Sequence, residues 1–257
     1  MAFWIICYKK VKGRVLLKEE YKDFELETTS IWSFPDRGNW ATHSGEYRGN
    51  WSPYIPRNLI LRYTKEKEWV LDPFVGSGTT AIEAALLNRN CIGVDINPRA
   101  LELAEKNMNG ITTECHNIFK QGDACKLEFM KENSIDLICM HPPYCDIIKY
   151  SKDIEGDLSL LCENEFYEKM KCVVQESYRI LKKGKYLALL IADIRKNGNI
   201  IPLGFNVMQI FKERGFALKE IIIKEQHNCR STERWEDISK KRNFLLIKHE
   251  YLFILKK

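Results

Sequence analysis

Three acidic residues and one proline-rich turn carry the chemical signal of this chain. Asp72, Asp95 and Asp123 each follow a short apolar run, and the sequence His-Pro-Pro-Tyr at 141–144 follows a fourth run at 135–140. Carboxylates accept hydrogen bonds from hydroxyl and amino groups and attract cations. The spacing therefore predicts a site for a ligand that carries hydroxyl groups, an amino group or a positive charge.

The elements that would position these residues begin with a strand and a glycine loop. An apolar run ends at Asp72, the chain turns through Gly76 and Gly78, and an apolar-periodic helix starts at Thr79. A second apolar run then ends at Asp95. This is the opening unit of a doubly wound α/β sheet, in which ligands bind beyond the carboxyl ends of the strands. The structural alternative is a tight strand-to-helix turn without a ligand.

The loop lacks the features of a phosphate-binding loop. No Gly-Lys-Ser/Thr follows Gly78, and the third glycine of the dinucleotide pattern is missing. An acid at the start of the loop would also repel a phosphate. Asp95, at the end of the second strand, is instead placed to accept hydrogen bonds from ribose hydroxyls.

The loop sequence resembles a known family. Asp72-Pro-Phe-x-Gly-x-Gly-Thr-Thr80, followed by Gly93-x-Asp-Ile-Asn-Pro98, is similar to the S-adenosylmethionine loop of the amino-group (adenine-N6 or cytosine-N4) DNA methyltransferases. The resemblance implies that residues 49–57 form the floor under the cofactor's methionine end, and that Asp123 bonds the adenine amino group. The cofactor-binding residues that it implies are Trp51, Pro53, Tyr54, Asp72, Pro73, Phe74, Gly76, Gly78, Thr79, Thr80, Asp95, Ile96 and Asp123.

The turn at 141–144 resembles the catalytic motif of the same family. There, a polar side chain and a backbone carbonyl accept the two protons of the base amino group, and an aromatic ring stacks on a base flipped out of the duplex. The resemblance implies that His141, Pro142, Pro143 and Tyr144 are catalytic, with the carbonyl at Pro142 and the stacking ring at Tyr144. His141 departs from the usual Asp, Asn or Ser. A neutral imidazole can accept one hydrogen bond, whereas an imidazolium cannot accept any, so His141 is either a neutral acceptor or a mark of lost or altered activity.

The remaining patterns predict a seven-stranded, Rossmann-like α/β domain of the S-adenosylmethionine-dependent methyltransferase class with an antiparallel last strand. Asn97-Pro98 predicts a helix start, and Lys182-Lys183-Gly184 predicts a helix end. We expect residues 1–30 to be an extension of unknown role and 31–257 to be the catalytic domain. Helices are expected at 79–88, 98–109, 166–181 and 203–214, and small recognition loops at about 145–164 and 225–242.

Two stretches combine aromatic and basic residues. Residues 31–54 carry six Trp, Phe and Tyr residues among Gly and Pro, which fits either a packed cap over the sheet or a flap that holds a planar ligand. The polar stretch 229–242 is either a solvated loop or a nucleic-acid contact, because cations bind phosphates and aromatic rings stack on bases. The nucleic-acid contacts that we expect are Arg37, Arg48, Arg230, Arg234, Trp235, Lys240, Lys241 and Arg242.

Composition limits the class of protein. The chain has 257 residues, a net charge of +5 and a hydrophobic fraction of 45%, which indicates one large domain with a mild preference for polyanions. Its nine cysteines are scattered without the spacing of a zinc site, as expected for reduced thiols in a cytoplasmic protein. No apolar run approaches the ~18 residues of a membrane span, and no metal site is expected.

We therefore expect an S-adenosylmethionine-dependent methyltransferase that acts on an exocyclic amino nitrogen of double-stranded DNA. The short loops imply either small recognition elements or a second copy or specificity partner that completes the DNA site. Two alternatives stay open: a catalytically silent cofactor-binding subunit of a modification complex, and a methyltransferase of RNA base amino groups. The residue types do not decide whether the target atom is adenine N6 or cytosine N4.

Overall fold

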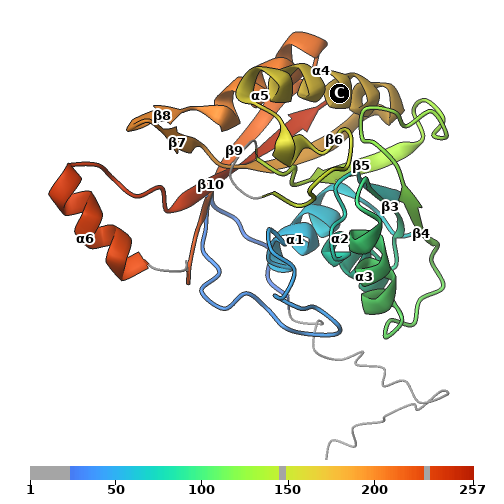
Figure 1. The fold of residues 1–257 in the computed structure, drawn as a ribbon. Coiled ribbons are helices and arrows are strands. Elements are labelled where there is room, and N and C mark those ends of the chain that lie inside the picture. Colours follow the sequence, from blue (N-terminus) through green and yellow to red (C-terminus); the bar gives the residue numbers. More distant parts are fainter. Residues whose placement is uncertain (1–23, 145–148, 229–231) are drawn as a thin grey trace, which may run out of the picture.

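Helices cover both faces of a central sheet in the computed structural model, which describes residues 24–144, 149–228 and 232–257 (Figure 1). The strands lie in the order β1-β9-β10-β6-β5-β2-β3-β4. Their bounds are β1 Ile31–Trp32, β2 Trp69–Asp72, β3 Asn90–Asp95, β4 Asn117–Gln121, β5 Ile135–Met140, β6 Leu181–Ile191, β9 Ala217–Glu225 and β10 His249–Lys256.

The topology confirms the predicted fold class. Strands β4, β3, β2, β5 and β6 pair in parallel, and β10 runs antiparallel to both β6 and β9. These seven strands form the expected sheet, and the two-residue strand β1 adds an eighth by pairing in parallel with the outer strand β9. Every residue of β5 is buried, as expected for a parallel strand with a helix layer on each face. The motif at 141–144 therefore leaves the sheet from its centre.

Each face of the sheet has its own helix layer and apolar core. Helices α1 (Tyr54–Tyr63), α2 (Thr79–Leu86) and α3 (Pro98–Met108) lie on one face, and α4 (Glu163–Ile180) and α5 (Leu203–Arg214) on the other (Figure 1). Buried aliphatic residues of α1 and α2 pack on the first face, and those of α4 and α5 pack on the second. The six described cysteines are free thiols.

Local signals explain most of the helix ends. Asn97 accepts a hydrogen bond from the Arg99 amide and Pro98 opens α3, as predicted. Helix α5 ends at Gly215 in the left-handed conformation. Helix α4 stops at Ile180, within one residue of the predicted end, but the predicted capping by Lys182-Lys183-Gly184 was wrong, because β6 begins directly at Leu181.

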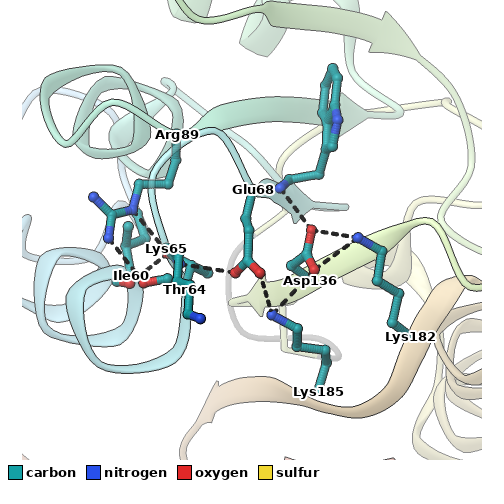
Figure 2. Close-up of polar contacts among 9 residues, drawn as sticks. Ile60, Thr64, Lys65, Glu68, Arg89, Asp136, Lys182 and Lys185 are labelled. Atoms are coloured by element: carbon teal, nitrogen blue, oxygen red, sulfur yellow. Dashed lines mark hydrogen bonds and ion pairs between the residues drawn. The ribbon is translucent and has the colours of Figure 1, made fainter.

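An ion-pair cluster explains the wrong prediction at Lys182-Lys183-Gly184. The register between β5 and β6 shifts at this point, and two lysines of β6 converge on the buried carboxylate of Asp136 (Figure 2). Lys182 Nζ lies 2.8 Å from Asp136 and Lys185 Nζ lies 3.2 Å from it, while Lys185 also pairs with Glu68 at 2.6 Å. Burial raises the pKa of Asp136, but bonds from Lys182, the Trp69 amide and Lys185 lower it below its usual value. The lysines thus join three strands at the end of the sheet opposite the acids, rather than capping a helix.

Two elements were not expected from the sequence. A hairpin, β7 (Ile194–Lys196) with β8 (Asn199–Ile201), follows β6. The stretch predicted as a loop at about 225–242 contains a helix, α6 (Thr232–Arg242), which lies apart from both helix layers (Figure 1). The Arg195 guanidinium donates to the carbonyl of Leu245 at 3.1 Å and lies over the Phe244 ring, so the hairpin is tied to the chain that follows α6.

Candidate functional site

The three strand-end acids line one cleft at the carboxyl edge of the parallel strands, as the sequence predicted. Asp72 is the last residue of β2, Asp95 is the last of β3, and Asp123 follows β4 by two residues. The cleft contains about 790 Å³ of space, its open mouth included. The strand order explains the convergence, since β2, β3 and β4 are consecutive neighbours in the sheet.

The glycine loop is held in place by Asp95. Its two carboxylate oxygens accept the amides of Gly76 at 3.0 Å and Asn97 at 2.9 Å. Gly76 has a φ of 51°, and a Cβ atom there would lie 3.0 Å from the ring of Tyr47, so this position requires glycine for space as well as for conformation. Each carboxylate oxygen retains a lone pair for a ligand, because it can accept two hydrogen bonds.

Asp72 is buried, and its hydrogen bonds compensate only partly for the loss of solvation of its carboxylate. Its oxygens accept the Phe74 amide at 3.0 Å and the Thr80 hydroxyl at 2.5 Å. Burial raises the pKa of Asp72 to about 7, with these two hydrogen bonds opposing the shift. A carboxyl in this state gains charge stabilisation from any cation that enters the cleft.

The charge of the cleft selects the chemistry of its ligand. Four carboxyl side chains line it, those of Asp72, Asp95, Asp123 and Asp157, and no Lys or Arg is among its described lining residues. This wall favours ligands that donate hydrogen bonds or carry positive charge, and it disfavours phosphates. Hydroxyl groups, an amino group and a cationic sulfur are the features of S-adenosylmethionine, so the residues present fit that cofactor.

Seven of the predicted cofactor residues line the cleft, and six do not. The seven are Trp51, Asp72, Phe74, Gly76, Asp95, Ile96 and Asp123. The six with other surroundings are Pro53, Tyr54, Pro73, Gly78, Thr79 and Thr80. Three of these six support the loop: the Thr80 hydroxyl binds Asp72, the Thr79 hydroxyl binds Asn50, and Gly78 lets α3 approach.

Part of the cleft wall comes from a segment that was predicted to be a recognition loop. Tyr150, Gly156, Asp157 and Leu158 line the cleft, and the last of them opens the short 3-10 helix Leu158–Leu160. The ring of Tyr150 stacks on that of Tyr47 with centroids 6.2 Å apart. No local pattern in the sequence marks these residues as cofactor contacts, because only the return of the chain over the sheet brings them there.

The aromatic segment 31–54 combines a packed cap with a ligand-facing wall. Trp40 and His43 each bond the same oxygen of Glu83 at 2.7 Å, and Arg57 pairs with the other oxygen at 2.8 Å. This buried cluster anchors the segment to α1 and α2. Trp51 faces the cleft from the far end of the segment. The packed-cap interpretation therefore holds for Trp40 and His43, and the role of the segment in holding a planar ligand stays a prediction.

The two arginines of this segment differ. The Arg37 guanidinium donates to the carbonyl of Trp51 at 2.9 Å, and burial lowers its pKa. Its guanidinium therefore shapes the cleft wall. Arg48 is exposed and can reach a polyanion.

A second cleft adjoins the first at His141. It is lined by Gly49, His141, Pro142, Pro143, Tyr144, Tyr150, Gln226 and Glu250. Four residues line both clefts: Gly49, His141, Pro143 and Tyr150. The His141 ring stacks on Trp51 with centroids 6.1 Å apart, so the imidazole forms part of the wall between the two spaces.

Tyr144 is fixed by its hydroxyl group. This group lies 3.1 Å from His141 Nε2 and donates to Glu250 Oε1 at 3.0 Å, while Lys224 Nζ binds Glu250 Oε2 at 2.9 Å. Burial lowers the pKa of His141, and the charge of Glu250 opposes that shift. A lowered pKa favours the neutral form of the imidazole at neutral pH.

The basic residues of α6 form an exposed face. Arg234, Trp235, Lys240, Lys241 and Arg242 are all exposed, and Trp235 retains 50% of its surface. Arg234 and Lys241, like Trp235 and Arg242, are seven residues apart, which places each pair on one side of the helix. Arg230 lies outside the described residues. The helical spacing thus places these side chains on shared sides of α6, whereas the sequence showed only that they occur in one stretch.

Parts of the chain are similar in sequence to known methyltransferases. Residues 5–106 match the family model of DNA methylases, and residues 59–184 match that of the RMKL-like methyltransferase domain. The chain is 37% identical over 97 residues to the Type II methyltransferase M2.MboI of Moraxella bovis, covering 38% of this chain and 36% of that protein. It is 30% identical over 106 residues to M.BglI of Bacillus subtilis, covering 41% and 29%. The chain thus spans about a third of the length of the curated relatives it matches.

Solved structures share the fold. TrmN from Thermus thermophilus matches with a TM-score of 0.54 at 21% identity, over 82% of this chain and 50% of that one. A S-adenosylmethionine-dependent methyltransferase from Methanosarcina mazei matches with a TM-score of 0.54 at 18% identity, over 77% and 96%. At these identities the matches establish the fold alone. In the described part of the chain, no helix is long and apolar enough to cross a membrane, and no cluster of metal-ligating side chains occurs.

Proposed function

We propose that this chain, whose residues 5–106 carry the sequence of the amino-group DNA methylase family, methylates an exocyclic amino nitrogen of a DNA base, adenine N6 or cytosine N4. One observation carries the proposal: the acidic cleft and the cleft of the His-Pro-Pro-Tyr motif share His141 and Pro143 as a common wall. A donor in one cleft and an acceptor in the other would meet at that wall.

In this proposal the acidic cleft holds S-adenosylmethionine, which supplies a methyl group on a positively charged sulfur. Asp95 accepts the ribose hydroxyls with the oxygen lone pairs that the loop amides leave free. Asp123 accepts the adenine amino group, and Asp72 provides negative charge near the motif. Tyr47 and Tyr150, stacked on each other, close the opening and exclude water.

The second cleft receives the base in this proposal. The base leaves the duplex and stacks on Tyr144, whose ring is fixed by the bond from its hydroxyl to Glu250. The Pro142 carbonyl and the neutral His141 ring accept the amino protons, which makes the nitrogen more nucleophilic. Because the nitrogen attacks the methyl group directly, no protein nucleophile is required.

Double-stranded DNA would be held outside the clefts. The exposed face of α6 offers cations for phosphates and Trp235 for stacking, and Arg48 adds a cation beside the cleft. Segment 149–162 contributes to the cofactor wall, so few residues remain for sequence recognition. We therefore propose that a second copy or a specificity partner completes the DNA site.

A second candidate is methylation of an RNA base amino group. The exposed cations and the Trp235 ring of α6 suit the phosphates and bases of RNA as well as those of DNA. It shares the cofactor cleft, the motif and the chemistry with the first candidate. The two differ in the polymer that α6 and its surroundings bind.

Methyl transfer from tritium-labelled S-adenosylmethionine to mixed genomic DNA and to total RNA, followed by nucleoside analysis, tests both candidates. We expect label in N6-methyladenine or N4-methylcytosine of DNA, and none with the Asp95→Ala variant. Label in RNA alone would support the second candidate. Cofactor binding by calorimetry without label in either polymer would identify a silent subunit.

A further inference from the structure

Three polar side chains that line the cleft of the His-Pro-Pro-Tyr motif contact one another, and a fourth, Lys224, binds one of them without lining the cleft. His141 and Tyr144 follow β5, Lys224 lies on β9, and Glu250 lies on β10. The contacts run in series: His141 Nε2 to the Tyr144 hydroxyl at 3.1 Å, that hydroxyl to Glu250 Oε1 at 3.0 Å, and Glu250 Oε2 to Lys224 at 2.9 Å. Glu250 is 6% exposed, and its distance from His141 Nε2 is 3.6 Å. The family motif does not include Glu250 or Lys224.

Counting protons shows that this series exists in two states with the same heavy-atom positions. The Tyr144 hydroxyl donates its single proton to Glu250 Oε1, so we assign the contact with His141 as a bond in which Nε2–H donates to the Tyr144 oxygen. In the neutral ring the lone pair then lies on Nδ1, which can accept a proton. In the protonated ring Nδ1 carries the added proton, and the bonds from Nε2 to Tyr144 and from Tyr144 to Glu250 stay as they are.

The series stabilises the protonated state of His141. Glu250 Oε1 receives the Tyr144 proton and Oε2 receives a proton of Lys224 in both states. Burial raises the pKa of Glu250, but His141 and Lys224 lower it below its usual value, so the carboxylate is charged. A buried carboxylate opposite the imidazole stabilises the imidazolium, and Lys224 opposes that effect.

Methylation of an amino group needs such an acceptor. When a methyl group replaces one hydrogen of the amino nitrogen, the N–H bond breaks and one proton is released. We propose that Glu250 is a positioning residue that makes His141 and Tyr144 a proton-accepting unit for this proton, an inference that rests on the proposed function. The proton ends on His141 Nδ1, the Tyr144 hydroxyl and Glu250 stabilise the resulting imidazolium through Nε2–H, and the unit later returns its proton to solvent. No heavy atom has to move.

The first test measures the titration of His141 in the protein without ligands. The chain has five histidines, so isotope-labelled histidine gives a small set of imidazole resonances, and the one lost in His141→Gln is that of His141. Glu250→Gln should lower the pKa of His141 by about one unit or more, and Lys224→Met should raise it. Glu220→Gln removes the same charge from an exposed position on β9 and should leave the titration unchanged.

Opposite shifts in the two variants exclude a merely structural effect, since loss of packing would move both in the same direction. An unchanged His141 titration in folded Glu250→Gln would overturn the inference. So would a shift of equal size in Glu220→Gln.

The second test uses turnover. Glu250→Gln should lower kcat about three- to tenfold with little change in KM for DNA, and the acid limb of its pH profile should move with the His141 titration. An equal loss of rate at every pH would contradict the proposal that Glu250 acts through the titration of His141. If the wild type transfers no methyl group to any polymer, the proposed function fails, whereas the titration experiment still decides whether the unit exists.

Discussion

Asp72 should make the affinity of the acidic cleft for a cationic ligand depend on pH. Burial raises the pKa of this carboxyl to about 7, so the cleft gains a negative charge as pH rises through that value. A cation binds the ionised form more tightly. The affinity for S-adenosylmethionine should therefore increase with rising pH up to about neutrality and fall below it.

The size of the effect follows from the ionised fraction of Asp72. For a group with a pKa of about 7, nearly all is ionised at about pH 8.5 and about 3% at about pH 5.5. If the cation bound only to the ionised form, the affinity would differ by up to about thirtyfold between these two conditions. The same change should be smaller for S-adenosylhomocysteine, whose sulfur is uncharged.

Calorimetric titration of both ligands across this pH range measures the effect. Asp72→Asn removes the titrating group and keeps an oxygen that can accept the Phe74 amide, so its affinity should be low and nearly flat with pH. His141 also titrates on the cleft wall, but burial lowers its pKa. Any change in affinity that comes from His141 should therefore occur at a lower pH than the change that comes from Asp72. Equal pH dependence in wild type and Asp72→Asn would refute the reasoning, as would equal slopes for the two ligands.

Three further predictions concern the sheet, the motif and the exposed helix. Asp136→Asn, which loses two lysine partners, should lower the free energy of unfolding by about 1–2 kcal/mol at pH 7. Since the pKa of this carboxyl is lowered, denaturant titrations should show that difference fading as pH falls from its unfolded value of about 3.9 through the lower folded value. Tyr144→Phe should keep KM for DNA but lower kcat, because the ring stays while its link to the proton acceptor is lost; Tyr144→Ala should abolish turnover with cofactor affinity retained by calorimetry. Replacing Lys241 and Arg242 by Ser should weaken DNA binding and reduce its salt slope by about one to two in fluorescence titrations, whereas the exposed control Lys219→Ser should not.

The sequence predicts the parts of this protein in which local pattern and tertiary structure agree. The apolar runs that end at Asp72 and Asp95 are strands because they are buried between two helix layers, and their order places both acids at one edge. Asn97-Pro98 begins α3 through a local side-chain bond. The prolines after Met140 force the chain out of the sheet, which brings His141 to the wall between the two clefts.

The missed features depend on contacts between residues far apart in the chain. Lys182 joins a strand because Asp136 lies opposite it, and nothing near it in the sequence signals that pair. Tyr150 and Asp157 reach the cofactor cleft through the return path of the chain. Glu250 reaches Tyr144 only because β10 inserts between β6 and β9. Polar composition alone did not distinguish the helix α6 from a loop.

The central claim is that the two clefts serve one methyl transfer at their shared wall, with neutral His141 accepting the amino group. Single-turnover methylation of DNA by wild type, His141→Ala and His141→Asp, from about one pH unit below the titration of His141 to about two above it, tests this claim most directly. The wild-type rate should fall on the acid side of that titration, the alanine variant should be slow throughout with unchanged cofactor affinity, and the aspartate variant should lose activity only at lower pH. Equal rates for wild type and His141→Ala at every pH would contradict the claim.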